Sequence, residues 1–294
     1  MTVADKRRLV EKHRRDFGAR FLCRLLGLHA SAFYYRTRGP TDDGMRDAIE
    51  SIAAEFPRYG YRRIQAELRR RHRTVNAKRI RRLMQEAHLV VQVRRLIRTS
   101  IYRPDRRDWP NLVKSRAIRQ PNEAWAADIT YIHVRHEYLY LAVLIDLYTR
   151  GIRGWYLDRD LSEELTHRAL DQALAEHPAP QIHHSDHGVQ YMSRRYVEKL
   201  QDHKVAISTA AKGKPYQNGI CERLIRTLKD EEVSLNEYLD LEDARTRMGL
   251  FLDDVYMFKR VHSALDYRTP AEFEADCLVQ PNRRLRNGSA GRGD

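Results

Sequence analysis

The stretch AWAADITYIHVRHEYLYLAVLIDLYTRGIRGWYLD, residues 124–158, decides the fold of this chain. It contains three apolar runs rich in β-branched and aromatic residues, which are the residue types enriched in strands. A short polar turn at Arg135 and His136 joins the first run to the second, and the third run follows at once. Because connections this short suit neighbouring antiparallel strands, the stretch predicts three adjacent antiparallel strands.

The pattern after residue 158 alternates between helix and strand. A capped amphipathic helix, a short strand, a second helix, a second strand and a final helix are predicted over residues 162–177, 180–185, 193–204, 205–209 and 215–233. Three strands followed by alternating helices and strands is the order of the ribonuclease H fold. We therefore predict an α/β domain over residues 121–275, with a mixed five-stranded sheet, flanking helices and further C-terminal helices.

Three carboxylates lie at positions that this fold brings together. Asp128 is within the first strand, Asp186 follows the fourth strand, and Glu222 is on the helix after the fifth. The first and fourth strands are neighbours in this fold, so we predict that the three side chains meet. Clustered acids repel one another unless cations lie between them, which indicates a site for two divalent ions. Arg226 and Lys229 share the helix face of Glu222 by their spacing.

Positive charge is concentrated in the first 120 residues. They hold 31 Lys and Arg against 12 Asp and Glu, whereas the remaining 174 residues hold 23 against 28. Nearly all of the excess is arginine, which is a better bidentate phosphate ligand than lysine. An ordinary charged run is a solvated surface, but an excess of this size in one part of the chain indicates a nucleic acid partner.

The basic part begins with a helix-turn-helix pattern. Residues 20–38 predict an apolar helix, a turn near Gly27 and a second helix that is opened by Ser31 and ends before Gly39. The spacing suits DNA binding but is a weak signal alone.

A second helical unit follows, with helices predicted over about 43–56, 59–71 and 76–89. Asn76 is the predicted N-cap of the last helix, and its apolar stripe is Ile80, Leu83 and Met84. Basic side chains lie largely away from that stripe. The predicted DNA contacts of this unit are Arg62, Arg63, Lys78, Arg79 and Arg82.

These patterns divide the chain into five segments. The segment between the helical units and the α/β domain has two prolines, many charges and no period, so it is predicted to be a basic linker. The expected segments are a helix-turn-helix-like region over 1–42, a second DNA-binding unit over 43–93, the linker over 94–120, the catalytic domain over 121–275 and a disordered tail over 276–294.

Composition excludes two other classes of protein. The longest apolar run, YLYLAVLI at 138–145, is too short to span a bilayer, and the first residues lack the apolar core of a signal peptide. Three cysteines, Cys23, Cys221 and Cys277, are odd in number and have no CxxC spacing, which disfavours a disulfide framework and a thiolate zinc site. We expect no membrane contact and a reducing, intracellular location.

Several residues near the carboxylates have a structural interpretation. His183, His184 and His187 have no cysteine pair beside them, so a zinc site is disfavoured. Asp146, at the end of a strand, is predicted to stabilise the turn before Gly151.

Packing also accounts for other candidates. Cys221, Trp125 and Tyr191 are predicted to pack in the core rather than to act on DNA. For Arg260 and His262, a packing or surface role and a DNA contact both remain open.

The residues around the carboxylates carry a resemblance to a known family. WAADITYI, HSDHGVQY and GKPYQNGICERLIRTLKDE, with 35 residues between Asp186 and Glu222, resemble the DDE catalytic core of bacterial insertion-sequence transposases, within the retroviral-integrase superfamily. LCRLLGLHASAFYY, YGYRRIQAELRRR, KRIRRLM and YMFKRVHSALDYRTPAEF resemble terminal segments of the second-reading-frame product of the insertion-sequence three family. The resemblance extends from about residue 9 to residue 275.

This resemblance implies a DNA transposase with Asp128, Asp186 and Glu222 as catalytic metal ligands. It implies two Mg²⁺ ions, for which Mn²⁺ can substitute, together with cleavage at the 3′ ends of an element and strand transfer. Lys229 is then expected to contact the terminal DNA. The implied partners are the terminal inverted repeats, target DNA, further copies of the chain on DNA, and a first-frame protein or frameshift fusion. The implied location is the bacterial cytoplasm, at the nucleoid.

Two other functions remain open. A metal-dependent nuclease of the same fold would cut without joining, and it would use the same carboxylates for hydrolysis that a transposase uses for transesterification. A DNA-binding regulator with an inactive catalytic domain is disfavoured, because all three carboxylates are present.

Overall fold

Two compact units, Met1–Asp47 and Ala48–Asp294, make up the chain in the computed structural model. The structure describes residues 1–34, 42–89, 109–135, 137–211 and 215–279. None of the described helices combines the length and the apolar character that crossing a bilayer requires. Cys23, Cys221 and Cys277 are free thiols, as predicted.

The described part of the first unit consists of α1 (Val3–Phe17), α2 (Ala19–Leu25) and α3 (Ala30–Tyr34). The predicted turn is confirmed, because Gly27 has a φ of 58° between α2 and α3. Helix α3 begins slightly earlier than predicted, and its predicted end before Gly39 lies outside the described residues. The small core of this unit is formed by Val10, Leu22, Cys23 and Leu28.

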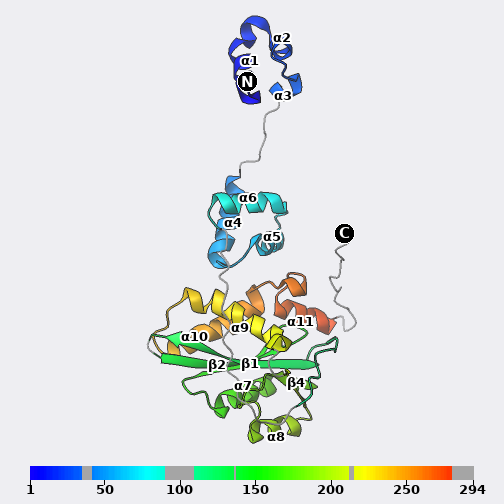
Figure 1. Ribbon diagram of the computed structural model, residues 1–294, viewed down its shortest axis with the longest axis vertical. Coiled ribbons are helices and arrows are strands. Elements are labelled where there is room, and N and C mark those ends of the chain that lie inside the picture. The colour runs from blue at the N-terminus through cyan, green and yellow to red at the C-terminus, as the bar shows by residue number, and fades with distance from the viewer. Residues whose placement is uncertain (35–41, 90–108, 136, 212–214, 280–294) are drawn as a thin grey trace. The chain divides into compact units, whose positions relative to one another are not determined.

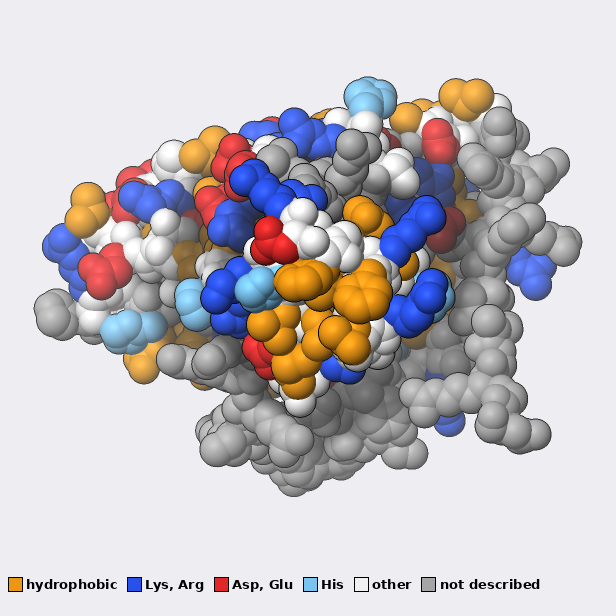
Figure 2. Space-filling view, turned by 90° about the horizontal axis from the view of Figure 1, so that it is seen from above, with side chains coloured by type: hydrophobic (Ala, Val, Ile, Leu, Met, Phe, Trp, Pro, Cys, Tyr) orange, Lys and Arg blue, Asp and Glu red, His pale blue; other side chains and the backbone are white. Residues whose placement is uncertain are grey.

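Apolar side chains are also exposed on the first unit. They include Phe17, Phe21, Leu25 and Tyr34. Figure 2 shows hydrophobic side chains gathered between Lys and Arg side chains on the face turned to the viewer.

The next helices are α4 (Asp43–Glu55), α5 (Tyr61–Arg70) and α6 (Ala77–Glu86), which confirms the three predicted helices. The boundary between the two units falls within α4. Asn76 caps α6 as predicted, since its side-chain oxygen accepts the Lys78 N–H at 2.9 Å. The buried apolar residues of these helices include Ile49, Ile52, Ile64, Leu68, Ile80, Leu83 and Met84.

A five-stranded mixed sheet forms the centre of the second unit, in the order β3-β2-β1-β4-β5 (Figure 1). The strands are β1 (Ala124–Val134), β2 (Glu137–Asp146), β3 (Ile152–Asp158), β4 (Ile182–Ser185) and β5 (Ala206–Thr209). The first three are antiparallel, whereas β4 runs parallel to β1 and β5 parallel to β4. The predicted sheet and the predicted neighbourhood of the first and fourth strands are therefore confirmed.

Helices cover both faces of this sheet (Figure 1). Helices α7 (Glu163–Glu176) and α8 (Arg194–Asp202) pack on one face, around a core that includes Trp125, Leu144 and Leu170. Helix α9 (Gly219–Glu231), preceded by η1 (Pro215–Asn218), packs on the other face with the C-terminal elements. Each face buries its own apolar cluster, so the sheet is sandwiched between two helical layers.

The C-terminal elements follow α9 in close succession. They are η2 (Val233–Leu235), α10 (Leu241–Gly249), η3 (Leu250–Lys259), η4 (Ser263–Leu265) and α11 (Pro270–Val279). Segment η3 is a π-helix that continues directly from α10. Helix α11 extends into the expected tail, and the rest of that tail, from residue 280, lies outside the described residues.

Part of the expected linker packs on the α/β core. Leu112 N–H donates to the Ser208 hydroxyl at 2.9 Å, and the Thr209 hydroxyl donates to the Trp109 carbonyl at 2.7 Å. Leu112, Val113 and Ile118 also contact the apolar cluster on the α9 face. Residues 109–120 thus belong structurally to the core, while residues 94–108 of the expected linker lie outside the described residues.

Helix α5 and the turn before it contact the same core through polar groups. The Val261 N–H donates to the buried Tyr59 hydroxyl at 2.9 Å. Arg70 forms two hydrogen bonds with the Glu272 carboxylate, at 2.8 and 2.6 Å. The basic helices and the sheet domain are therefore joined by a defined set of contacts within the second unit.

Candidate active site

Asp128 lies where β1 changes from a central strand to an edge strand. Strand β4 pairs with β1 only from Ala124 to Ala126, so Asp128 follows the last paired residue closely. On its other side, Asp128 is opposite Val143 of β2. The side chain is therefore fixed by the sheet but open on one flank, next to the end of β4.

Asp186 directly follows β4 and lies in a tight turn. Its carboxylate accepts the Gly188 N–H at 2.8 Å. A Cβ atom at Gly188 would approach the same oxygen to 2.9 Å, so a larger residue at this position would displace the Asp186 carboxylate. Although Asp186 is exposed, the protein atoms around its carboxyl group raise its pKa, against the lowering effects of the Gly188 hydrogen bond and His187.

Glu222 lies in the first turn of α9, where the helix dipole favours a negative charge. The start of α9 is held against β1, because the buried Asn218 amide donates to the Ala127 carbonyl at 3.0 Å. This bond is one residue from Asp128. Asn218 was not predicted to have a role, since nothing in its sequence context shows that it reaches across to the strand.

The three carboxylates interact electrostatically. Burial and the negative charges of Asp186 and Glu222 together raise the pKa of Asp128 to about 8, against a hydrogen bond from the Ile129 N–H and the charge of Lys229. Without a cation, the Asp128 carboxyl group is therefore mostly protonated at neutral pH. The predicted proximity of the three acids is consistent with this mutual effect.

The three side chains are of a type that binds divalent cations, but their positions do not form a complete set of metal ligands. Among the residues that the structure describes, no three His, Cys, Asp or Glu side chains stand in a metal-holding arrangement. Carboxylate oxygens are the ligands that Mg²⁺ and Mn²⁺ prefer, and a raised pKa through mutual repulsion is the condition that a bound cation relieves.

Lys229 and Arg226 occupy different environments on α9. The Lys229 ammonium lies 4.4 Å from the centre of the Tyr131 ring, and its charge lowers the pKa of Asp128. Arg226 is exposed, and it makes no hydrogen bond or ion pair with the part of the chain that the structure describes. Tyr131 was not predicted as part of the site, because its position in an alternating strand indicates only exposure.

The other predicted DNA contacts lie on α5 and α6. Arg62 is exposed and donates to the Tyr61 hydroxyl, whereas Arg63 forms an ion pair with Glu231 at 3.1 Å. The three basic residues on α6 are Lys78, Arg79 and Arg82, of which Lys78 and Arg82 are exposed and Arg82 lies 3.6 Å from Glu86. Arg63 thus has a partner within the protein. The DNA contacts of the other four residues stay predictions.

Asp146 has the structural role that was predicted for it. It is fully buried and accepts the N–H groups of Asn122, Tyr148 and Thr149 at 2.6 to 2.9 Å. It also lies 3.3 Å from Arg153. These partners fix the turn between β2 and β3, so the carboxylate is not available for chemistry.

The two histidines within β4 are also structural. His183 contacts the Tyr196 hydroxyl at 2.9 Å and His184 contacts the Ser208 hydroxyl at 2.8 Å. Burial lowers the pKa of His183 to about 3 and that of His184 to about 4, so both are neutral. Neither forms part of a metal-holding group among the described residues.

Core packing accounts for the remaining candidates. Cys221, Trp125 and Tyr191 are buried in the two apolar clusters of the sheet, as predicted. For Arg260 and His262, the structure favours packing, because Arg260 is buried and bonded to Glu231 while His262 lies beside it.

Comparison with known proteins identifies the family. Models described as "Integrase core domain" match residues 118–215 and 203–270, and one described as "HTH-like domain" matches residues 41–95. The HTLV-2 integrase catalytic core domain in complex with magnesium is 18% identical, with a TM-score of 0.42, over 53% of this chain and 97% of that chain. A chain of the simian T-cell lymphotropic virus intasome is 16% identical, with a TM-score of 0.49, over 78% and 76%.

Curated relatives match over most of their length. The transposase for insertion sequence element IS904 of Lactococcus lactis is 34% identical, over 78% of this chain and 93% of that protein. Transposase InsF for insertion sequence IS3A of Escherichia coli is 31% identical, over 90% of this chain and 96% of that protein. The chain belongs to the IS3 family of transposases, enzymes of DNA transposition that carry an integrase core domain and an HTH-like domain.

Proposed function

We propose that this enzyme cleaves phosphodiester bonds at the 3′ ends of an insertion element and transfers the freed ends to target DNA. The observation that carries this proposal is the electrostatic coupling of Asp128 with Asp186 and Glu222 at the open edge of β1. In a transposase with an integrase core domain, three coupled carboxylates at one sheet edge are the expected centre of phosphoryl transfer.

Asp128, Asp186 and Glu222 are the residues that would hold metal ions, and the proposed ions are two Mg²⁺, for which Mn²⁺ can substitute. Bound there, the metal would activate the attacking oxygen and stabilise the leaving oxygen of a phosphodiester. The chain keeps the acids in register by the pairing of β1 with β4 and by the Asn218 bond to the strand.

Basic side chains around the carboxylates would position DNA. The charge of Lys229 acts on Asp128, and Arg226 is exposed on the same helix. Both side chains are proposed to bind phosphates of the terminal DNA. Arg62, Lys78, Arg79 and Arg82 of the HTH-like domain would bind the duplex further away. Arg63 would contribute only through its ion pair with Glu231.

The proposed partners are the terminal inverted repeats of the element and its target DNA. We expect the enzyme to act as a homo-oligomer on DNA, because two element ends must be joined in one reaction. A first-frame protein, or a fusion to it by frameshift, is a further proposed partner, and the proposed place of action is the nucleoid.

A joining assay tests this function. The substrate is a labelled duplex that carries the inverted repeat found in the DNA flanking the reading frame, with an unlabelled target plasmid. With Mg²⁺, the label should appear first in a shortened strand and then in products longer than the substrate, and neither should form in EDTA. Shortened strands without longer products would indicate a nuclease instead, and binding without cutting would indicate a regulator.

A further inference from the structure

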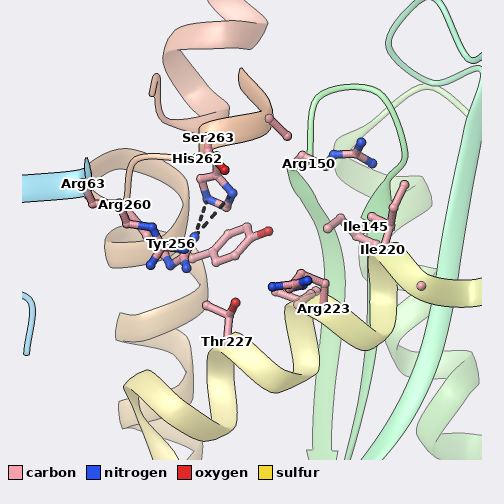
Figure 3. Close-up of a pocket in the computed structure, with 13 residues that line it drawn as sticks. Arg63, Ile145, Arg150, Ile220, Arg223, Thr227, Tyr256, Arg260, His262 and Ser263 are labelled. Atoms are coloured by element: carbon pink, nitrogen blue, oxygen red, sulfur yellow. Dashed lines mark hydrogen bonds between the residues drawn. The ribbon is translucent and has the colours of Figure 1, made fainter. Parts of the chain in front are cut away.

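A cavity of about 370 Å³ lies on the side of α9 that faces away from the three carboxylates. Gly219, Arg223 and Thr227 line it from one face of α9, whereas Glu222 lies about 100° around the helix from Arg223. Elements far apart in the sequence supply the other walls, including the turn after β2, the end of η3 and η4 (Figure 3). The cavity is therefore distinct from the proposed active site, although both share one helix.

Four arginines line this cavity: Arg63, Arg150, Arg223 and Arg260. One carboxylate, Glu231, bonds two of them, accepting from Arg260 at 2.6 and 2.8 Å and from Arg63 at 3.1 Å. A single negative charge is thus shared between two guanidinium groups. The wall keeps a positive excess even where its arginines are paired.

The other two arginines have no carboxylate hydrogen bonded to them in the described structure. Arg150 donates to the Leu147 carbonyl at 2.6 Å. Among the described carboxylates, Asp146 affects the pKa of Arg150. Asp146 already accepts hydrogen bonds from three N–H groups and lies 3.3 Å from Arg153. Arg223 makes no hydrogen bond or ion pair with any described residue. Since no described residue uses the five N–H donors of Arg223, they can bind a ligand in the cavity.

The positive charge of the arginines also affects His262. It lies in the cavity wall, 3.4 Å from the Arg260 guanidinium (Figure 3). Burial and the charges of Arg260, Arg63 and Arg150 together lower the pKa of His262 to about 2. The imidazole is neutral and can donate or accept a hydrogen bond without adding to the charge.

The backbone adds two further features. Arg150 has a φ of 63°, a left-handed conformation that costs free energy for a residue other than glycine and is often kept for function. Gly219 is the first residue of α9, so the N-terminal N–H groups of that helix lie at the cavity. The dipole of α9 favours a negatively charged ligand at this place.

We propose that this cavity binds a phosphate group, held by Arg223 and Arg150 with the first turn of α9. A guanidinium group can donate two parallel hydrogen bonds to the oxygens of a phosphate. The excess positive charge of the cavity would repel a cation. The phosphate comes from the DNA backbone or from a free phosphate compound. The first source rests on the proposed function, whereas the second does not.

Two measurements on the full-length chain test this site. The first is the melting temperature in EDTA with increasing inorganic pyrophosphate, at constant ionic strength, where a ligand of the folded state raises the melting temperature by mass action. The second is the salt dependence of binding to a random-sequence duplex, where each phosphate contact adds about 0.9 to the log–log slope. EDTA excludes any contribution of metal at the carboxylates, so this test is independent of catalysis.

Three variants separate the cavity from general surface charge. Arg223→Gln removes the unpaired guanidinium, and Ala264→Phe blocks the cavity from the exposed η4 without changing any charge. Arg168→Gln is the matched control, an exposed arginine of α7 on the opposite face of the sheet. We expect the first two to lose the pyrophosphate shift or to lower the salt slope by about 0.9, and the control to do neither.

The pattern of results identifies the source of the phosphate. A lower slope in both cavity variants assigns the site to the DNA backbone, and a lost pyrophosphate shift with an unchanged slope assigns it to a free phosphate compound. The proposal is overturned if wild type shows no pyrophosphate shift and Arg223→Gln keeps the full slope. It is equally overturned if Ala264→Phe, shown to be folded, behaves as wild type in both measurements.

Discussion

Buried charges in this protein fall into two kinds. Asp146 and Arg260 have complete sets of partners, and each holds together segments that are distant in the sequence. Asp128 has the opposite environment, because its charged neighbours Asp186 and Glu222 repel its ionised form. A partnered buried charge stabilises structure, whereas a repelled one is typical of a functional site.

The buried His183 predicts a dependence of stability on pH. Its folded-state pKa of about 3 lies below the unfolded value, so the unfolded chain binds the extra proton first. The contribution of the neutral His183 to stability is therefore present above about pH 6.5 and is lost as the pH falls. From pH 6.5 to 5 we expect this residue alone to lower the free energy of unfolding by about 2 kcal/mol.

Urea unfolding of the full-length chain at both pH values measures this loss. His183→Gln, which keeps a polar partner for Tyr196, should show a smaller loss than wild type. His203→Gln, at an exposed residue after α8, is the control and should behave as wild type. An equal loss in His183→Gln and wild type would show that His183 is not held neutral in the folded protein.

At the scale of elements, β3 and α7 approach each other unusually closely at Gly154. A Cβ atom there would lie 2.3 Å from the Ala169 carbonyl oxygen and 2.9 Å from the Ala173 nitrogen, both in the helix backbone. Gly154→Ala should therefore lower the free energy of unfolding by about 1–3 kcal/mol, because the helix must shift. In Gly219→Ala the new Cβ has open space, so its urea midpoint should not fall; similar midpoints in the two variants would refute the close approach.

One buried hydroxyl, in the turn before α5, contributes to the contact of this region with the core. Tyr59→Phe would leave the Val261 N–H without its partner, and an unsatisfied buried donor costs about 1–3 kcal/mol. The exposed Arg70 pair with Glu272 should matter less, so Arg70→Gln should cost under about 1 kcal/mol. Chemical denaturation of both variants gives the comparison, and an equal or larger effect of Arg70→Gln would contradict this ranking.

The sequence predicted elements where a short-range pattern decides them. The alternation in 124–158 predicted three strands, and the Asn76 cap predicted the start of α6. The π-helix of η3 could not be predicted, because it continues α10 without any break in composition. The packing of residues 109–120 was missed for a related reason, since charge and prolines hide the few apolar residues that contact the core.

The same limit applies to sites in the whole molecule. The parallel pairing of β1 with β4, on which the proposed meeting of Asp128 with Asp186 rests, could be predicted from the order of the elements. The arginine cavity could not, because its four arginines come from four separate segments whose neighbourhood only the packed structure defines. The spacing of residues along the chain predicts a site whose residues lie on neighbouring strands of one sheet. It does not predict a site whose residues come from several packed layers.

Residues 109–120 predict where the catalytic domain must begin. A fragment of residues 121–279 loses the Trp109 and Leu112 contacts with β5 and exposes the surface that Val113 and Ile118 cover. A fragment of residues 109–279 keeps them, so it should have the higher urea midpoint. Equal midpoints for the two fragments would show that this segment adds nothing to the stability of the domain.

Three carboxylates, on β1, directly after β4 and on α9, are proposed to act as one catalytic centre. Asp128→Asn, Asp186→Asn and Glu222→Gln each keep the size of the side chain but remove one charge that a metal site needs. Asp202→Asn, at the exposed end of α8, is the matched control. Asp146→Asn is unsuitable because that carboxylate is buried with four partners.

The deciding measurement is strand transfer of a labelled element end by these four variants, with folding and DNA binding checked in each. Every triad variant should bind DNA like wild type yet lose activity by about 100-fold or more, while Asp202→Asn stays near wild type. A folded triad variant that joins DNA at close to the wild-type rate would contradict the account, as would a loss in Asp202→Asn equal to that of the triad variants.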